Sequence, residues 1–223
     1  MTEGKLATRR GREVRRAARA QGDLVKLGAI HRRIPAVELL HSEAVEIIEH
    51  NAETILEEIG IEFRRDPASL QLWREAGADV QGERVRLPRG LCRHLLRSAP
   101  SVFKVHARNP TRTVQFGGDV TVFSPVGGPP FVTDLDRGRR YATLEDLVNF
   151  IKLAQMAPAI HFSGGSACEP MDIPPGKRHL DVQYAYFRHS DQACEGTPET
   201  PGHAADAVRM AQLVFGADFV DTH

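Results

Sequence analysis

The last third of the chain constrains the fold most, because short apolar segments and helical segments alternate there. Ala159–Ser163 is a short apolar strand that ends at two glycines, and a helix is predicted over 177–188. Gln192–Cys194 is a second short strand, and a second helix is predicted over 201–215. Alternating strands and helices are typical of βα units whose strands run in parallel. This part of the sequence therefore predicts an α/β fold.

The number of residues limits how many βα units the chain contains. Ala159 to His223 spans 65 residues, whereas a complete (β/α)8 TIM barrel takes about 250 residues. Two units fit, and a third strand is expected at Asp218–Val220, just before the sequence stops. We therefore expect residues 158–223 to form the first βα units of a truncated TIM barrel.

Residues 39–157 carry the pattern of an α+β region. Ser42 is predicted to cap a helix whose apolar residues, at three- and four-residue intervals, form one packed face up to Gly60. Thr143 is predicted to cap a later helix over 144–156. Between them we expect a strand, a helix, a hairpin and a third helix, at 61–63, 66–77, 80–87 and 88–98. Strand-forming residues then predict a small antiparallel sheet or meander, at 102–107, 113–116, 120–123, 131–135 and 139–142.

Between two of these strands lies Phe123–Asp134, which reads FSPVGGPPFVTD. Gly127 and Gly128 allow positive φ angles, while Pro129 and Pro130 exclude a helix and remove two backbone donors. Clusters of Gly and Pro are ordinary punctuation between strands, so the local chemistry favours a structural turn. The alternative is a rigid, shaped surface that a ligand or another chain approaches closely.

Charge is unevenly distributed although the chain is neutral as a whole. Residues 1–33 contain ten Lys or Arg and three acidic residues, a net charge of +7. We expect residues 1–38 to be a basic, partly disordered leader, with an RNA-contacting arm or an organelle address as alternatives. The leader lacks the apolar run of a secretory signal, and we find no transmembrane stretch. Since the secretory signal is missing we expect a cytoplasmic protein, and since there is no global basic field we expect it to bind neither nucleic acid nor membrane.

Three cysteines are odd in number and far apart, as in a protein with reduced thiols: Cys92, Cys168 and Cys194. No Cys-x-x-Cys or paired-histidine spacing supports zinc, so we expect no metal site. Cys168 and Cys194 would act as nucleophiles only beside an activating base, and the sequence does not show one.

Three segments together resemble the trimethylamine methyltransferase family: 123–134 (FSPVGGPPFVTD), 141–153 (YATLEDLVNFIKL) and 160–165 (IHFSGG). Members of that family are corrinoid-dependent enzymes that demethylate methylated amines. The resemblance covers nearly everything from about residue 40 to the end, as well as the Arg-rich leader. It corresponds to the N-terminal part of such a protein, because family members continue past this length and complete a TIM barrel. Further matching pieces are ILEEIGIEF at 55–63, APSVFKVHARNP at 99–110 and the helix over 208–215.

The resemblance implies transfer of a methyl group from a tertiary or quaternary amine to the cobalt of a corrinoid carried by a separate protein. With a quaternary amine the leaving group is a neutral tertiary amine, so no proton donor is required. The enzyme would orient the methyl group and hold the cation with carboxylates and aromatic faces. We expect the corrinoid protein and the amine as partners, no cofactor bound directly, and a homo-oligomer at full length. The sequence does not choose between trimethylamine and a quaternary amine such as glycine betaine, carnitine or proline betaine.

Two carboxylates and a histidine are candidates for the amine site, and no catalytic residue is assigned. Glu195 ends the second strand, where a carboxylate either faces a cation or forms a salt bridge with the following helix. Glu169 lies just after the first strand, and His161 lies on it. For His161 a packed, hydrogen-bonded role is the favoured alternative, since nothing beside it has metal-ligand spacing.

Aromatic residues and the paired glycines complete the candidate site. Phe123, Phe131 and Phe162 would line an aromatic pocket, although each is also an ordinary core residue. The resemblance favours a role for the loop that carries Gly127 and Gly128, in shaping the amine pocket or the surface for the corrinoid protein. This reading requires the loop to lie near the C-terminal ends of the two strands.

Two other functions stay open. A truncated chain that keeps the surface of the family but lacks activity would act at most as a binding or interaction protein. If the natural protein ends at His223, we expect no methyl transfer from it. An α/β hydrolase is disfavoured because the chain has no Gly-x-Ser-x-Gly motif.

Overall fold

The structure is a computed structural model that describes residues 27–35, 37–196 and 198–222. The predicted basic leader therefore lies mostly outside the described residues. Its disorder, and its alternative roles in RNA binding or targeting, stay predictions. No helix in the described part of the chain is both long and apolar enough to cross a bilayer.

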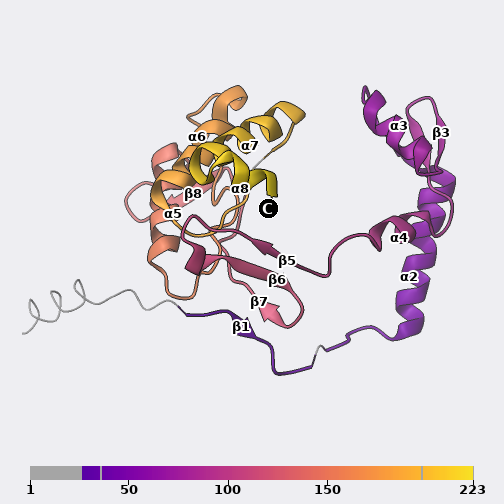
Figure 1. Cartoon of the computed structure of the whole chain (residues 1–223), viewed down its shortest axis with the longest axis horizontal. Coiled ribbons are helices and arrows are strands. Elements are labelled where there is room, and N and C mark those ends of the chain that lie inside the picture. The colour runs from indigo at the N-terminus through magenta and orange to yellow at the C-terminus, as the bar shows by residue number, and fades with distance from the viewer. Residues whose placement is uncertain (1–26, 36, 197, 223) are drawn as a thin grey trace, which may run out of the picture. The chain divides into compact units, whose positions relative to one another are not determined.

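The chain divides into two compact units (Figure 1). One unit is Arg33–Ser101, and the other combines Val102–His223 with the N-terminal residues up to Arg32. Both contain helices and short antiparallel strands, so the predicted mixture of helix and strand is confirmed. The expected domain limits, 39–157 and 158–223, stay a prediction.

The Arg33–Ser101 unit begins with a long helix that changes type near its end. Helix α2 (Ser42–Thr54) continues into the π-helical turn η1 (Ile55–Ile59), and Gly60 ends it with a φ of 70°. The predicted cap at Ser42 is wrong, because His41 holds the N-cap position and makes no side-chain cap bond. The backbone N–H of Val45 donates to the carbonyl of His41, which places Ser42 inside the first turn.

A three-stranded antiparallel sheet and two short helices complete this unit. The strands lie in the order β2-β4-β3, and Val85 on β4 is fully buried. Asp66 caps helix α3, where its carboxylate accepts from the backbone N–H of Ser69 at 3.1 Å, as the sequence predicts. The elements are β2 (Ile61–Glu62), α3 (Pro67–Glu75), β3 (Asp79–Gln81), β4 (Arg84–Arg86) and α4 (Leu91–Leu96).

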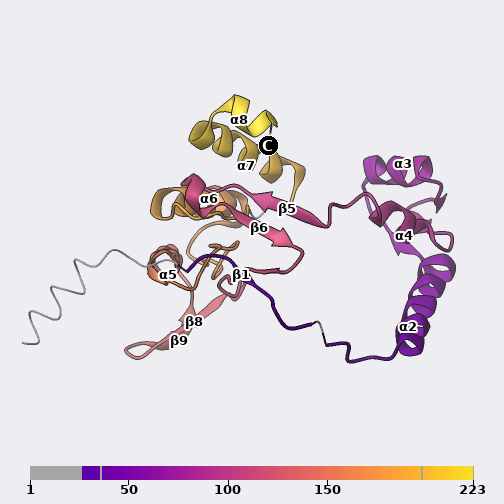
Figure 2. The same cartoon turned by 60° about the horizontal axis from the view of Figure 1, so that its bottom comes forward.

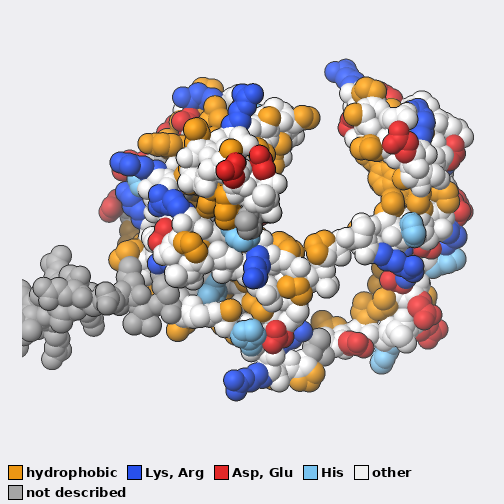
Figure 3. Space-filling view, in the orientation of Figure 1, with side chains coloured by type: hydrophobic (Ala, Val, Ile, Leu, Met, Phe, Trp, Pro, Cys, Tyr) orange, Lys and Arg blue, Asp and Glu red, His pale blue; other side chains and the backbone are white. Residues whose placement is uncertain are grey.

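The sequence predicts that one apolar face of α2 and η1 is packed, and within this unit that prediction is wrong. Ile48, Ile55 and Ile59 are each more than half exposed, and apolar side chains reach the visible surface of the unit (Figure 3). Leu56 packs against the buried core instead. Glutamates flank it and pair with arginines of the following segment, Glu57 with Arg89 at 3.0 Å and Glu49 with Arg93 at 2.8 Å. Ion pairs with the following segment therefore hold a face of the helix that differs from the predicted apolar face.

Short antiparallel ladders are found where a small antiparallel sheet or meander was expected in the second unit. Strand β5 (Val102–Val105) pairs with β6 (Val114–Gly117), and β8 (Phe131–Asp134) pairs with β9 (Gly138–Tyr141). Strand β7 (Val120–Thr121) pairs instead with β1 (Ile30–His31), a segment that the sequence analysis placed in the leader. The loop rich in Gly and Pro after β7 separates β7 from β8, so these two strands do not pair with each other. Each ladder of this unit therefore has two strands. A 3-10 turn, η2 (Pro110–Arg112), links β5 to β6.

Three long helices form the body of this unit. Helix α6 packs on α5 and on α7, so it lies between them (Figure 2). Leu147 and Ile151 of α5 are fully buried against Val182 and Tyr186 of α6, together with Cys168. The helices are α5 (Leu144–Met156), α6 (Pro175–His189), α7 (Pro201–Phe215) and the short α8 (Ala217–Thr222).

The capping box predicted for α5 is present and continues into a cluster of charged groups. The hydroxyl of Thr143 accepts from the backbone N–H of Asp146, whose carboxylate accepts from the backbone N–H of Thr143. Arg140 on β9 donates two bonds to the same carboxylate, at 2.5 and 2.7 Å, and a third to Asp134 at 3.0 Å. This arrangement joins the β8–β9 hairpin to the start of α5.

Acid is expected to destabilise this unit through Asp146. Hydrogen bonds from Arg140 and then from Thr143 hold the pKa of its carboxyl far below the ordinary value of 3.8. The folded state therefore gains stability above the ordinary pKa and loses it as the pH falls below about 4. Melting temperatures measured between about pH 5 and pH 2.5 should fall more gently for Asp146→Asn than for the wild type. Asp136→Asn gives the comparison, and an unchanged slope in Asp146→Asn would show that the cluster does not couple to folding.

Parallel pairing in the described residues is limited to one bridge, between Phe162 and Ala193. A partial TIM barrel is not confirmed. The strand expected at Asp218–Val220 is wrong, since these residues lie in α8. A strand needs a neighbour for its backbone groups, whereas the helix satisfies them locally, as in the 3.2 Å bond from the N–H of Val220 to Gly216. Phe219 of this helix also stacks on Phe215, with ring centroids 5.7 Å apart.

Candidate functional site

The loop after β7 lies against the C-terminal end of the first predicted strand. The carbonyl of Phe123 accepts from the backbone N–H groups of His161 and Phe162, at 3.0 and 3.2 Å. Further along the loop, the N–H of Gly128 donates to the carbonyl of Ser166 at 2.8 Å, and Pro129 accepts from Glu169 at 2.9 Å. The loop therefore follows the strand past its end, as its predicted role at the site requires.

The two glycines of the loop allow it to approach its own chain closely. A Cβ atom on Gly127 would lie 3.3 Å from the carbonyl oxygen of Ser166. Gly128 has a φ of 89°, a conformation that side-chain-bearing residues rarely adopt. Gly164, with a φ of 73°, turns the chain under the loop, and its nearest neighbour there is the carbonyl of Pro125 at 3.8 Å from the Cβ position. The close packing of the loop against the turn at Gly164 is enough to explain why glycines occupy these positions, and no ligand is needed.

Glu195 stands beside this turn because the two predicted strands meet in one parallel bridge, between Phe162 and Ala193. The N–H of Ser163 donates to Ala193 at 2.9 Å, and the N–H of Glu195 donates to Gly164 at 3.2 Å. The side chain of Glu195 then crosses the end of the first strand, where Oε1 lies 3.0 Å from the Cβ position of Gly165. Glu195 is exposed and forms no ion pair among the described residues. Its carboxylate is therefore an uncompensated negative charge next to the loop.

Glu169 differs from Glu195 because a cation already faces it. Its carboxylate lies 3.6 Å from Nη1 of Arg178, in the first turn of α6. It lines a small cavity of about 40 Å³ together with Arg178, His179 and His203. The backbone of Glu169 is hydrogen-bonded to the loop, whereas its side chain lines the cavity between α6 and α7.

His161 is fully hydrogen-bonded within the protein. Its Nδ1 accepts from the backbone N–H of Phe123 at 3.2 Å, so its Nε2 carries the proton and donates to the carbonyl of Gly28 at 3.2 Å. The imidazole thereby fastens the N-terminal segment to the start of the loop. This arrangement matches the packed role that the sequence analysis favoured for it.

The candidate aromatic residues lie in three different places. Phe162 is buried and meets Phe116 edge to face at 5.3 Å, in a core shared with β6. Phe123 is half exposed and stacks on His161. Phe131 carries the guanidinium of Arg139 over its ring at 3.8 Å, so a cation of the protein itself covers one face. The structure does not gather these rings into one aromatic pocket.

Burial makes both cysteines near the site poor nucleophiles. Cys168 is fully buried, and burial raises the pKa of its thiol to about 11. Burial likewise raises the pKa of Cys194 to about 11. At neutral pH almost no thiolate is present at either position, and the thiolate is the reactive form.

We expect Cys168 and Cys194 of the native chain to resist thiol reagents. At about pH 8 the thiolate makes up roughly one part in a thousand of a thiol with a pKa near 11. Disulfide-exchange labelling should therefore modify both residues at least about tenfold more slowly in buffer than in urea. Rapid labelling of either residue in the folded chain would contradict the burial described for it.

Sequence reasoning missed a pair of stacked histidines and a polar network. The rings of His179 on α6 and His203 on α7 lie 3.7 Å apart, and Nε2 of His179 lies 3.0 Å from the carboxylate of Asp206. Ser163 bonds Ser190 at 3.0 Å behind the site. These contacts join residues of separate elements, so no local spacing in the sequence signals them. No group of three or more metal-ligating side chains occurs among the described residues.

The family resemblance is confirmed by comparison with known proteins. A family profile described as trimethylamine methyltransferase (MTTB) matches residues 8–223, which is nearly the whole chain. The chain belongs to the trimethylamine methyltransferase family. This membership agrees with the three segments at 123–134, 141–153 and 160–165, which include the loop and the turn at Gly164.

Three curated relatives of the chain carry names that refer to quaternary amines. The chain is 44% identical over 183 residues to a glycine betaine methyltransferase of Desulfitobacterium hafniense (strain Y51), covering 82% of the chain and 38% of that relative. It is 27% identical over 135 residues to a proline betaine:corrinoid methyltransferase of Eubacterium limosum, covering 60% of the chain and 27% of the relative. An L-carnitine:corrinoid methyltransferase of the same organism is 28% identical over 142 residues, covering 63% and 29%. The chain thus spans about a third of the length of these relatives.

Proposed function

We propose that this chain binds the cationic head of a betaine-type quaternary amine and belongs to a protein that transfers one of its methyl groups to a corrinoid protein. The observation that carries the proposal is the exposed carboxylate of Glu195, which has no ion-pair partner among the described residues. Quaternary ammonium groups have no N–H to donate, so carboxylates and aromatic faces are the groups that recognise them. The names of the three relatives support an amine of this class.

The charge of the substrate defines what Glu195 contributes. In the transfer, the bond between the methyl carbon and nitrogen breaks, and its electron pair stays on nitrogen, which becomes a neutral tertiary amine. The positive charge that Glu195 attracts therefore disappears as the bond breaks. An interaction that weakens toward the transition state supports binding and not the chemical step. We thus assign Glu195 to holding the substrate.

A reduced corrinoid on a partner protein would supply the nucleophile for the methyl carbon. On this chain the surface that fits such a partner is the exposed loop, where Val126 is 82% exposed. The loop and α5 border an open apolar groove of about 420 Å³, lined by Val126, Phe150 and Leu153 among others. Exposed apolar surface beside a binding site is typical of protein interaction sites. Because the chain spans about a third of its relatives, the activity and partners of the whole protein are part of this proposal.

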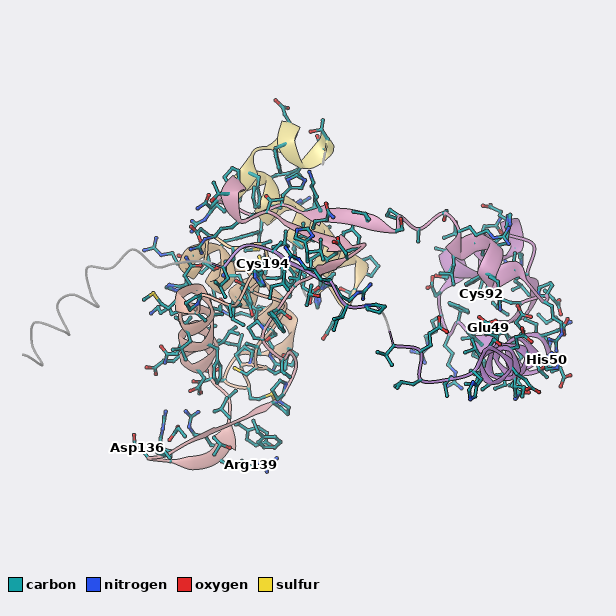
Figure 4. The ribbon with its side chains drawn as sticks, turned by 90° about the horizontal axis from the view of Figure 1, so that it is seen from below. Glu49, His50, Cys92, Asp136, Arg139 and Cys194 are labelled. Atoms are coloured by element: carbon teal, nitrogen blue, oxygen red, sulfur yellow. The ribbon has the colours of Figure 1, made fainter. Side chains whose placement is uncertain are left out.

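Glu195→Gln is expected to weaken binding of glycine betaine by about threefold to fivefold. The loss is modest because an exposed charge pair contributes about 1 kcal/mol or less. Titration of the isotope-labelled chain, followed by NMR, gives the two affinities. Asp136→Asn is the matched control: it removes an equal charge at the tip of the β8–β9 hairpin, well away from Cys194, the neighbour of Glu195 in the chain (Figure 4).

The outcomes separate a specific site from general attraction. If Glu195→Gln and Asp136→Asn weaken binding equally, the chain attracts the cation through its overall charge only. If the folded wild-type chain binds no quaternary amine from a panel of glycine betaine, proline betaine and carnitine, the proposed function is wrong for this chain.

A further inference from the structure

We infer that Gly165 is a positioning residue that keeps the carboxylate of Glu195 at the end of the strand pair, an inference that rests on the proposed function. A Cβ atom on Gly165 would lie 3.0 Å from Oε1 of Glu195, 3.4 Å from its Cγ and 3.6 Å from its Cδ. Three successive atoms of the glutamate side chain therefore lie directly over the backbone of Gly165. The absence of a side chain at residue 165 leaves the space that they occupy.

Both backbones at this contact are held in place. The N–H of Glu195 bonds the carbonyl of Gly164, next to Gly165, and the neighbouring bridge of Phe162 with Ala193 fixes the register. On the other side of Gly165, the carbonyl of Ser166 accepts from the loop. Because neither backbone is free to shift, the position of the carboxylate depends on the space over residue 165.

A side chain at residue 165 would move Glu195 without unfolding the chain. A Cβ atom 3.0 Å from Oε1 is tighter than most real Cβ contacts, so the carboxylate must give way by a few tenths of an ångström. The far end of an exposed glutamate rotates into solvent at little cost, because no ion pair holds it. Gly165 shows no positive φ, so alanine is compatible with its backbone. The expected effect is therefore on the position of the charge and not on stability.

The test compares Gly165→Ala with Gly176→Ala in the same chain. Gly176 also lacks a positive φ, and a Cβ atom there meets nothing within 4 Å. We expect Gly165→Ala to weaken binding of glycine betaine about threefold while Gly176→Ala leaves it unchanged. In a chain that already carries Glu195→Gln, Gly165→Ala should have no further effect, because the two changes act through one carboxylate.

A second measurement needs no ligand. In the wild-type chain the α protons of Gly165 should show a nuclear Overhauser contact with the γ protons of Glu195, and the contact should weaken in Gly165→Ala. Absence of the contact in the wild type overturns the inference even if glycine betaine binds. An equal loss of affinity from Gly165→Ala with and without Glu195→Gln also overturns it, because the effect would then be structural. If the contact is present but no betaine binds, the proposed function fails and the role of Gly165 in binding fails with it.

Discussion

Gly60→Ala is expected to destabilise the Arg33–Ser101 unit by about 3 kcal/mol or more. Gly60 has a φ of 70°, and a Cβ atom there would lie 2.3 Å from the carbonyl oxygen of Val85. Val85 is fully buried on the central strand, so its carbonyl has no room to retreat. Trp73 is the single tryptophan of the chain and packs on Phe63 with ring centroids 6.0 Å apart. Its fluorescence during urea denaturation therefore reports this unit.

Gly77→Ala isolates the contribution of the backbone conformation. Gly77 has a φ of 92°, but a Cβ atom there meets nothing within 4 Å. Its replacement should cost about 1 kcal/mol, the ordinary penalty for alanine in a left-handed conformation. Equal losses for Gly60→Ala and Gly77→Ala would mean that the close approach of Val85 does not matter. Such a result would contradict the close contact between Gly60, at the end of the α2–η1 helix, and Val85 on the sheet.

Leu147→Ala is expected to remove about 2 to 5 kcal/mol from the second unit. Leu147 is fully buried in α5 and belongs to the core shared with α6, so its truncation loses buried apolar area and leaves a cavity. Unfolding followed by circular dichroism, or by hydrogen exchange of the α5 and α6 amides, measures the loss. Leu153→Ala on the same helix is the control, since Leu153 is 65% exposed.

The same pair of variants tests which face of α5 is inside. Leu153→Ala should cost less than about 1 kcal/mol, because a surface substitution changes little burial. A larger loss for Leu153→Ala than for Leu147→Ala would contradict the core described here. It would also indicate that another part of the protein covers the exposed face in solution.

Features that depend on neighbouring residues could be predicted from the sequence. The cap of Thr143 on helix α5 and helix α7 at Pro201–Phe215 follow from local hydrogen bonds and conformational preferences, and they are confirmed. The family could be inferred from three short segments, and the match over residues 8–223 confirms it.

Features that depend on distant partners could not be predicted. Ile48 repeats with the period of a buried helix face, yet it is exposed because Leu56 and the glutamates beside it face the rest of their unit. A strand was expected at Asp218–Val220, but these residues lie in helix α8. The pairing of β1 with β7 joins residues about ninety positions apart, and no spacing in the sequence indicates it.

The contacts around the candidate site residues also depend on distant parts of the chain. Local chemistry alone favoured a structural turn for the loop, and only the family resemblance placed it near the strand ends. Which carboxylate stays free could not be read from the sequence, because it depends on Arg178 reaching Glu169 while no cation among the described residues reaches Glu195. The bonds of His161 to Gly28 and Phe123 likewise join three separate segments.

Recognition of a positive charge by Glu195 is the central claim, and one titration tests it most directly. Glycine betaine and tert-butylacetate have nearly the same shape and the same carboxylate, but carbon replaces the charged nitrogen in the second compound. We predict that the chain binds glycine betaine more tightly than tert-butylacetate, by about threefold to fivefold, and that Glu195→Gln removes the difference. Equal binding of the two compounds by the wild-type chain, or a preference that survives in Glu195→Gln, would contradict the account.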